Sequence, residues 1–213
     1  MIPSLTTILE RLREDVRTGL AKDPAATDAA TVALLYTGLH AVWGYRIAHA
    51  LWERGHEFTA RFLSQFIRFL TGVEIHPAAD IGRRLFIDHG AGVVIGETAE
   101  IGDDVLLYHG VTLGGDSMRR VKRHPTLGDD VSVGANATLV GDITVGEGAT
   151  VGAGSVVVED VPPGVTVAGV PAEIVAGTGA ARSATDGESG SDPDVDSGSD
   201  PDVDSGPEEC HAG

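Results

Sequence analysis

An aliphatic residue recurs every six positions between residues 75 and 157 and is usually followed by glycine. A period of six fits neither the repeat of an α-helix, about 3.6 residues, nor that of a strand, about two. It is typical of a parallel β-helix, in which six residues form one flat side and one corner. The aliphatic side chain then points into the prism, while Gly, Asn or Asp takes the corner, where a left-handed backbone costs least. The longest unbroken series is Leu127, Val133, Leu139, Val145, Val151 and Val157.

Two breaks in this register predict loops. The spacing between aliphatic positions rises to fourteen, two more than a multiple of six, from Ile81 to Ile95 and again beyond Leu113. A solenoid accommodates extra residues as loops that leave its surface, and such loops often carry function. The extra residues fall within 88–92 and 114–126, and both segments contain histidine. These are the two places where we expect chemistry.

Apolar residues recur at helical spacing before the repeat begins. Residues 2–20 place them on one face, with charged residues opposite, and Pro24 ends this helix because it forces Asp23 out of the helical region. Further helical stretches follow at 28–36, 38–54 and 57–71. The pattern therefore predicts a helical cap domain over residues 1–72 that leads into the β-helix.

The repeat gives way to a different pattern at its C-terminal end. Prolines at 162 and 163 and a change of period predict a closing coil, which completes a β-helix domain over 73–177. Residues 178–213 are rich in Gly, Ser and Asp and hold ten acidic residues against one Arg. Such a segment buries too little apolar surface to offset the entropy of ordering, so we expect a disordered acidic tail. The predicted fold class is α+β, mainly β.

Composition narrows the function classes. The apolar fraction of 42% supports a sizeable core, and the net charge of −17 argues against nucleic acid and anionic membranes as partners. The single cysteine, Cys210, rules out an intramolecular disulfide and fits a reducing cytoplasm. No signal peptide is expected, because charges interrupt the first apolar run, and the uncharged stretch 29–45 is too short and too polar to span a membrane.

Asp88 and His89, at the first break, are candidates for acid–base chemistry. A neutral imidazole can take a proton from a hydroxyl near neutral pH, and a carboxylate can fix its tautomer. A surface turn with a neighbouring histidine explains the same residues. A metal site would need three converging ligands, and the histidines do not show that spacing, so no metal is expected.

Residues 119–124 form the only dense basic cluster in this acidic chain. The cluster could hold an anionic substrate or a cofactor phosphate. A solvated loop that balances the protein's own carboxylates is the other interpretation. Because the lone cysteine lies in the tail, any acyl transfer must be direct and cannot use a thiol intermediate.

Four motifs follow one another along the repeat: Asp-His-Gly at 88–90, Gly-Glu-Thr-Ala at 96–99, Gly-Val-Thr-Leu-Gly-Gly at 110–115 and Arg-His-Pro at 123–125. Through this series, residues 23–175 resemble the serine O-acetyltransferase family. This series is far more specific than a generic six-residue repeat. It implies a left-handed parallel β-helix and direct transfer of an acetyl group from acetyl-CoA to the hydroxyl of L-serine, on the route to cysteine.

The resemblance also implies catalytic roles. His89 corresponds to the general base that deprotonates the serine hydroxyl. Its partner carboxylate corresponds to Glu74, where the family usually has Asp, so the charge is kept and the reach changes. His124 corresponds to a second active-site histidine that orients substrate and stabilises the tetrahedral intermediate.

Binding roles follow from the same resemblance. Asp23 and Asp88 match carboxylates that hold the serine ammonium group, and Arg123 matches the guanidinium that holds its carboxylate. Small residues that line the acetyl-CoA groove correspond to Gly114, Gly115, Ala135 and Ala153.

The chain departs from the family pattern at three places. Asp116-Ser117-Met118 replaces Thr-Gly-Lys, and Glu173 stands where a basic residue often follows Val-Pro-Ala, so potential contacts to the CoA nucleotide are lost. The C-terminal Ile with which the family docks into cysteine synthase is absent.

We expect a cytoplasmic enzyme that is a homotrimer, or a hexamer built as a dimer of trimers, with active sites between neighbouring prisms. The alternatives are a hexapeptide acetyltransferase for another acceptor, such as a sugar, homoserine or an antibiotic, and a non-catalytic scaffold for a cysteine-synthesis complex.

Overall fold

The computed structural model describes residues 5–177 and begins with helices where the apolar spacing predicts them. Two of the helix ends have clear local causes. Asp28 caps the second helix by accepting hydrogen bonds from the backbone N–H groups of Ala30 and Thr31, and Gly72 ends the fourth helix in a left-handed conformation with φ of 75°. The helices are α1 (Leu5–Lys22), α2 (Ala29–Leu35), α3 (Thr37–Trp52) and α4 (Glu57–Thr71).

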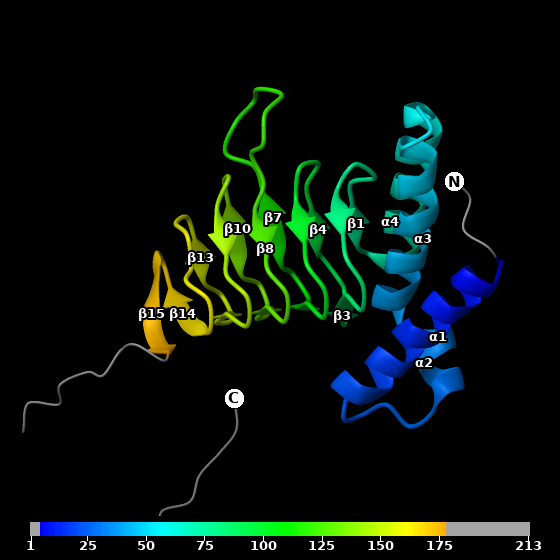
Figure 1. The fold of residues 1–213 in the computed structure, drawn as a ribbon, viewed down its shortest axis with the longest axis horizontal. Helices are drawn as coiled ribbons and strands as arrows, with labels where there is room; N and C mark the ends of the chain where they lie inside the picture. Colours follow the sequence, from blue (N-terminus) through cyan, green and yellow to red (C-terminus); the bar gives the residue numbers. More distant parts are fainter. Residues whose placement is uncertain (1–4, 178–213) are drawn as a thin grey trace, which may run out of the picture. The chain divides into compact units, whose positions relative to one another are not determined.

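Short strands follow, separated by regular turns (Figure 1). Their bounds are β1 (Glu74–Ile75), β2 (Asp80–Ile81), β3 (Phe86–Asp88), β4 (Val94–Ile95), β5 (Glu100–Ile101), β6 (Leu106–Tyr108), β7 (Thr112–Gly114), β8 (Thr126–Leu127), β9 (Ser132–Val133), β10 (Thr138–Val140), β11 (Thr144–Val145), β12 (Thr150–Val151), β13 (Val156–Val157), β14 (Val165–Gly169) and β15 (Ala172–Gly177).

The strands form three sheets, and from β1 to β13 every third strand returns to the same sheet. The first sheet has the order β1-β4-β7-β10-β13, the second β11-β8-β5-β2, and the third β15-β14-β12-β9-β6-β3. All pairs are parallel except the last, β14 with β15, which closes the end of the coil as an antiparallel hairpin. Hexapeptide coils with parallel sheets are thus confirmed.

The six-residue period is explained by the register between coils. On each sheet the aliphatic residue of one coil pairs with that of the next, so the columns stack inside the prism. The column of the first sheet consists of Ile75, Ile95, Leu113, Leu139 and Val157, all of which are buried.

The helices α3 and α4 pack on the first coil through close contacts. The Tyr45 hydroxyl donates to the carbonyl of Ala79 at 2.5 Å, and the Ser64 hydroxyl donates to the carbonyl of Ile75 at 2.6 Å. Gly38 lies so close to the backbone of Ile87 that a Cβ there would sit 2.0 Å from the carbonyl oxygen. These contacts fix the cap next to the first break in the repeat.

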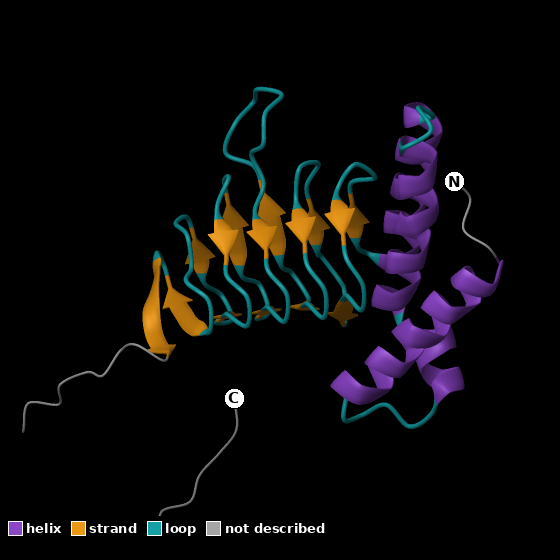
Figure 2. Cartoon of the chain, viewed as in Figure 1, coloured by secondary structure: helices purple, strands orange, loops and turns teal. Residues whose placement is uncertain are grey.

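Two corners of the prism carry the loops that the register breaks predict. The open corner leads from the third sheet to the first and comprises residues 89–93, 109–111, 134–137 and 152–155. The loop corner leads from the first sheet to the second and comprises residues 76–79, 96–99, 115–125 and 141–143. The long loop between β7 and β8 stands out from the loop corner (Figure 2).

Some predictions lie outside the described residues. The acidic tail at 178–213 and Cys210 are among them. Within residues 5–177, no helix is both long enough and apolar enough to cross a membrane.

Candidate functional site

Three of the predicted site residues gather in one pocket beside the open corner. The pocket has a volume of about 350 Å³, and Asp23, Asp88 and His89 line it together with Tyr36 and other residues. Asp23 comes from the turn after α1, whereas Asp88 ends β3 and His89 begins the first inserted turn. Residues 65 positions apart are brought together because the cap packs on the first coil.

His89 is poised at the surface of this pocket. Its backbone takes a left-handed conformation with φ of 61°, which is unusual for a residue with a side chain. The side chain is 74% exposed, and its Nε2 lies 3.8 Å from Oδ2 of Asp88. An exposed imidazole next to a carboxylate can accept a proton from a bound hydroxyl group.

Asp23 is held as a carboxylate. It accepts a hydrogen bond from the Tyr36 hydroxyl and another from the backbone N–H of Ala25 at 2.7 Å. The Tyr36 bond, followed by that of Ala25, lowers the pKa of Asp23 below its usual value, and the same bond to Asp23 raises the pKa of Tyr36 to about 12. Asp23 is therefore an anion at neutral pH, as the binding of an ammonium group requires.

His109 is a neighbour that sequence reasoning missed. Its ring stacks edge-to-face on that of His89, with centroids 5.9 Å apart. Its Nδ1 is buried without a hydrogen-bond partner in the described part of the chain. His109 occupies the corner position that Ala135 and Ala153 fill in later coils. A histidine in place of a small residue of the repeat is the sequence feature that could have identified it.

The predicted acetyl-CoA residues Ala135 and Ala153 lie on the same corner as His89. A ladder of backbone hydrogen bonds connects the coils there, from the N–H of Asn136 to His109 at 2.9 Å and from the N–H of Gly154 to Ala135 at 2.8 Å. Ala153 is exposed, and a Cβ added at Gly154 would meet nothing within 4 Å. The corner thus offers a surface of small residues that an extended ligand can approach closely.

His124 lies at the loop corner and is almost completely buried, with 8% of its surface exposed. Its Nδ1 contacts the hydroxyl of Thr98 at 2.9 Å and the backbone N–H of Thr98 at 3.2 Å. Burial, and then the charge of Arg123, lower the pKa of His124. The imidazole is consequently neutral at neutral pH.

Arg123 is held by its own chain. Its Nη2 lies 2.5 Å from Oε2 of Glu97, and its Nη1 donates to the carbonyl of Arg119 at 2.9 Å. Lys122 contacts the carboxylate of Glu100 at 3.0 Å, so the basic cluster is in part neutralised by acidic residues of the neighbouring coil. These contacts fix the direction of the Arg123 guanidinium, and sequence reasoning did not foresee Glu97.

Gly114 and Gly115, which are predicted to line the acetyl-CoA groove, lead from β7 into this loop. Gly114 ends the strand, and its carbonyl accepts a hydrogen bond from the N–H of Gly141 at 3.1 Å. Gly115 is exposed, and a Cβ there would lie 3.0 Å from Nε2 of His124.

Glu74 makes an ion pair with Arg68 of α4, with 3.3 Å between Oε2 and Nε. The carboxylate that faces the His89 ring at ion-pair distance is that of Asp88. The pairing of Glu74 with His89 therefore stays a prediction.

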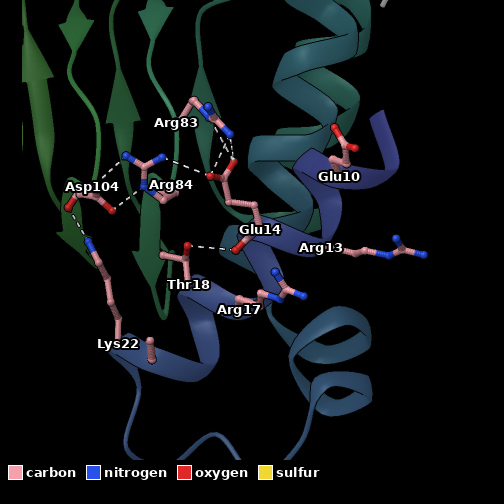
Figure 3. A pocket seen from close by; sticks show the side chains of 10 residues that line it. Glu10, Arg13, Glu14, Arg17, Thr18, Lys22, Arg83, Arg84 and Asp104 are labelled. Atoms are coloured by element: carbon pink, nitrogen blue, oxygen red, sulfur yellow. Dashed lines mark hydrogen bonds and ion pairs between the residues drawn. The ribbon is translucent and has the colours of Figure 1, made fainter. Parts of the chain in front are cut away.

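A second charged hollow, of about 560 Å³, lies between α1 and the first coils (Figure 3). Glu14 binds both Arg83 and Arg84, and Arg84 also binds Asp104 at 2.7 Å. The Lys22 ammonium donates to the backbone carbonyl of Asp104. Because these ion pairs join α1 to the first coils, the hollow is best explained as a clamp that holds α1 on the β-helix.

No group of three or more His, Cys, Asp or Glu side chains is placed to hold a metal ion within residues 5–177. The polar groups at the two corners are those of acid–base and anion-binding chemistry.

The comparisons with known proteins agree on one family. A model described as bacterial transferase hexapeptide (six repeats) matches residues 124–158. A serine acetyltransferase of Mycobacterium tuberculosis is 55% identical over 167 residues, which are 78% of this chain and 73% of that protein. A serine acetyltransferase of Bacillus subtilis is 55% identical over 163 residues, 76% of this chain and 75% of that protein.

Solved structures extend the likeness to three dimensions. The Neisseria gonorrhoeae serine acetyltransferase in complex with serine superposes with a TM-score of 0.76 at 45% identity, covering 79% of this chain and 69% of that one. The Brucella abortus serine acetyltransferase in complex with coenzyme A has a TM-score of 0.78 at 40% identity, covering 82% of this chain and 70% of that one.

Proposed function

The chain belongs to the serine acetyltransferase family, and we propose that its two corners supply the two halves of one active site. The enzyme transfers the acetyl group of acetyl-CoA to the hydroxyl of L-serine, giving O-acetylserine and CoA in cysteine biosynthesis. The proposal concerns which residues perform this reaction.

His89 is the proposed general base. Its neutral imidazole removes the proton of the serine hydroxyl while the oxygen attacks the thioester carbonyl, which forms a tetrahedral intermediate. The intermediate collapses by breaking the carbon–sulfur bond, and the CoA sulfur leaves with the proton that His89 carries. Glu74 is proposed to orient the imidazole, with Asp88 as the carboxylate already near it.

Charged groups at the two corners match the two ends of the acceptor. The carboxylates of Asp23 and Asp88 bind the serine ammonium group, and the Arg123 guanidinium binds its carboxylate. Glu97 keeps the Arg123 fork in one direction, which supports this role. The neutral His124 donates a hydrogen bond from Nε2 and so orients substrate and stabilises the intermediate.

Acetyl-CoA is proposed to run along the small residues of the prism, Gly114 and Gly115 from one corner, Ala135 and Ala153 from the other. The exposed Gly115 and Ala153, with the partly exposed Gly114 and Ala135, let the pantetheine arm lie against the backbone. No residue of the acceptor site needs to form a covalent intermediate.

We also propose a left-handed coil and a homotrimer with active sites between neighbouring prisms, and the separation of the two halves supports the placement of these sites. His89 lies at the open corner and Arg123 at the loop corner, on opposite sides of the first sheet. A neighbour that presents its loop corner to the open corner completes the site, as in a closed ring of identical subunits.

The apolar side chains of α4 add a surface for a further contact. Phe58, Phe62 and Phe69 are 84%, 67% and 84% exposed, which favours a hexamer built as a dimer of trimers. We also propose three segments, namely a cap at 1–72, a β-helix at 73–177 and a tail at 178–213. A cytoplasmic location and cysteine synthase as a candidate partner belong to the same proposal.

The single observation that carries the proposal is the pocket shared by Asp23, Asp88 and His89, because two carboxylates and a base there suit an amino-acid acceptor. The test compares L-serine with its methyl ester, in the wild type and in Arg123→Lys, by following thiol release from acetyl-CoA. We expect kcat/KM to fall roughly 10- to 100-fold for the ester and for the variant with serine, because a point charge does not replace the bidentate fork.

The variant should also discriminate less between serine and its ester than the wild type does. Equal rates with serine and a neutral sugar would instead favour the alternative of a sugar acetyltransferase on this scaffold. Absence of turnover with every acceptor would favour the non-catalytic scaffold.

A further inference from the structure

Thr98 anchors the segment that carries the predicted substrate-binding residues of the loop corner. It lies in the turn between β4 and β5, one coil away from the loop. All three of its polar groups bond to residues 122–124. Its carbonyl accepts from the Lys122 ammonium at 2.8 Å, and its hydroxyl accepts from the backbone N–H groups of Arg123 at 3.0 Å and His124 at 3.2 Å.

The hydroxyl of Thr98 has one hydrogen, and its place follows from these bonds. Since the oxygen already accepts from two N–H groups, its own hydrogen is left to donate, and Nδ1 of His124 lies 2.9 Å away. The backbone N–H of Thr98 points to the same Nδ1 at 3.2 Å. A nitrogen that accepts from two donors carries no proton, so the ring proton of neutral His124 lies on Nε2.

The Nε2 edge of His124 faces two positions that have no side chain. A Cβ added at Gly96 would lie 2.1 Å from Nε2, and one added at Gly115 would lie 3.0 Å from it. Glycine at both positions keeps the donor edge of the ring uncovered by side chains of its own coils. The ring is thus held from the Nδ1 side by Thr98, and no side chain of residue 96 or 115 covers its Nε2 side.

We propose that Thr98 is a positioning residue that fixes His124 as an Nε2–H donor toward the bound acceptor. This inference deepens the proposed function and rests on it for the place of His124 in the active site. Thr98 itself touches neither substrate; it acts by setting which nitrogen of His124 can donate and by holding Arg123 in register.

The electrostatics of the loop corner agree with this role. An imidazolium would place an Nδ1–H against the backbone N–H of Thr98, two donors facing each other. The groups that face the ring include the Arg123 and Lys122 cations and the Glu97 and Asp116 carboxylates, and burial comes first among the causes that lower the pKa of His124. A neutral donor with a fixed tautomer is the result.

The test measures the tautomer directly, by ¹⁵N–¹H NMR of the imidazole nitrogens in the complete enzyme, for the wild type, Thr98→Val and Thr98→Ser. We expect a single Nε2–H form of His124 in the wild type and a mixture in Thr98→Val. The same variant should lose roughly 10- to 100-fold in kcat, because one hydrogen bond is lost and two backbone N–H groups lose their acceptor. Thr98→Ser keeps the hydroxyl and should restore both readouts. Thr144→Val, an exposed threonine of β11, is the matched control and should change neither.

An Nδ1–H ring in the wild type overturns the inference whether or not any variant folds. Unchanged kcat together with an unchanged tautomer in folded Thr98→Val overturns it as well. Failure of the proposed function looks different: His124→Ala would then keep full activity, while the tautomer in Thr98→Val would still become mixed.

Discussion

The two corners of the prism hold complementary chemistry in contrasting ways. At the open corner His89 is 74% exposed and has as its near neighbours the Asp88 carboxylate and the ring of His109. At the loop corner His124 is 8% exposed and fixed by Thr98. The proposed base is exposed and can meet substrate, whereas the proposed donor is held in one direction by its hydrogen bonds. We infer that the first side chain changes its protonation state during the reaction and that the second does not.

We expect the largest effect from removing the exposed histidine, His89. In His89→Ala we expect kcat to fall roughly 10²- to 10⁴-fold, the usual contribution of a general base, with the fold intact. The measurement is steady-state thiol release from acetyl-CoA with saturating serine. His56→Ala, at an exposed position before α4, is the matched control.

Glu74→Gln tests the proposed orienting carboxylate. It should lower kcat less than His89→Ala does, because it removes an orienting charge and leaves the base in place. Near-normal turnover in His89→Ala removes this residue from the mechanism, and a Glu74 effect as large as that of His89 would show that the carboxylate does more than orient.

Acid should lower the stability of the protein through the loop corner, an effect smaller than that of His89→Ala on activity. His76 lies at the loop corner of the first coil, and burial, followed by the charge of Arg61, lowers its pKa from 6.5 to about 4. The unfolded chain binds this proton at higher pH than the folded chain does. The stabilising contribution is therefore complete above about pH 6.5 and is lost as the pH falls toward 4.

The measurement is the thermal midpoint as a function of pH for the wild type and His76→Gln. The difference between the two curves isolates His76 from the many carboxylates that also titrate. We expect a flatter dependence between pH 7 and pH 4 in the variant, with exposed His56→Gln as the control. Parallel curves would contradict the partly buried, neutral state of His76.

The sequence predicts much of this architecture because the repeat ties each residue to a position on the prism. The six-residue period identifies the columns of the core, and the two register breaks mark both loops of the site. The side-chain partners could not be predicted in the same way. Thr98 and His124 are 26 residues apart and meet only because successive coils stack, and Glu97 meets Arg123 for the same reason.

Two further contacts could not be predicted from the local sequence. Arg68, the partner of Glu74, comes from α4 and depends on how the cap packs against the first coil. His109 sits at an ordinary corner position, and the significance of its ring arises from the inserted turn that carries His89 next to it.

The central claim is that one subunit supplies His89 and its neighbour supplies Arg123 and His124. Its most direct test is complementation between two inactive variants, His89→Ala and His124→Ala, produced together in one cell and purified as mixed oligomers. In a closed ring with random mixing, about one site in four combines an intact His89 with an intact His124, so about a quarter of the wild-type activity should return. If both residues acted within one subunit, every site would lack one of them, and mixed oligomers no more active than the separate variants would contradict the account.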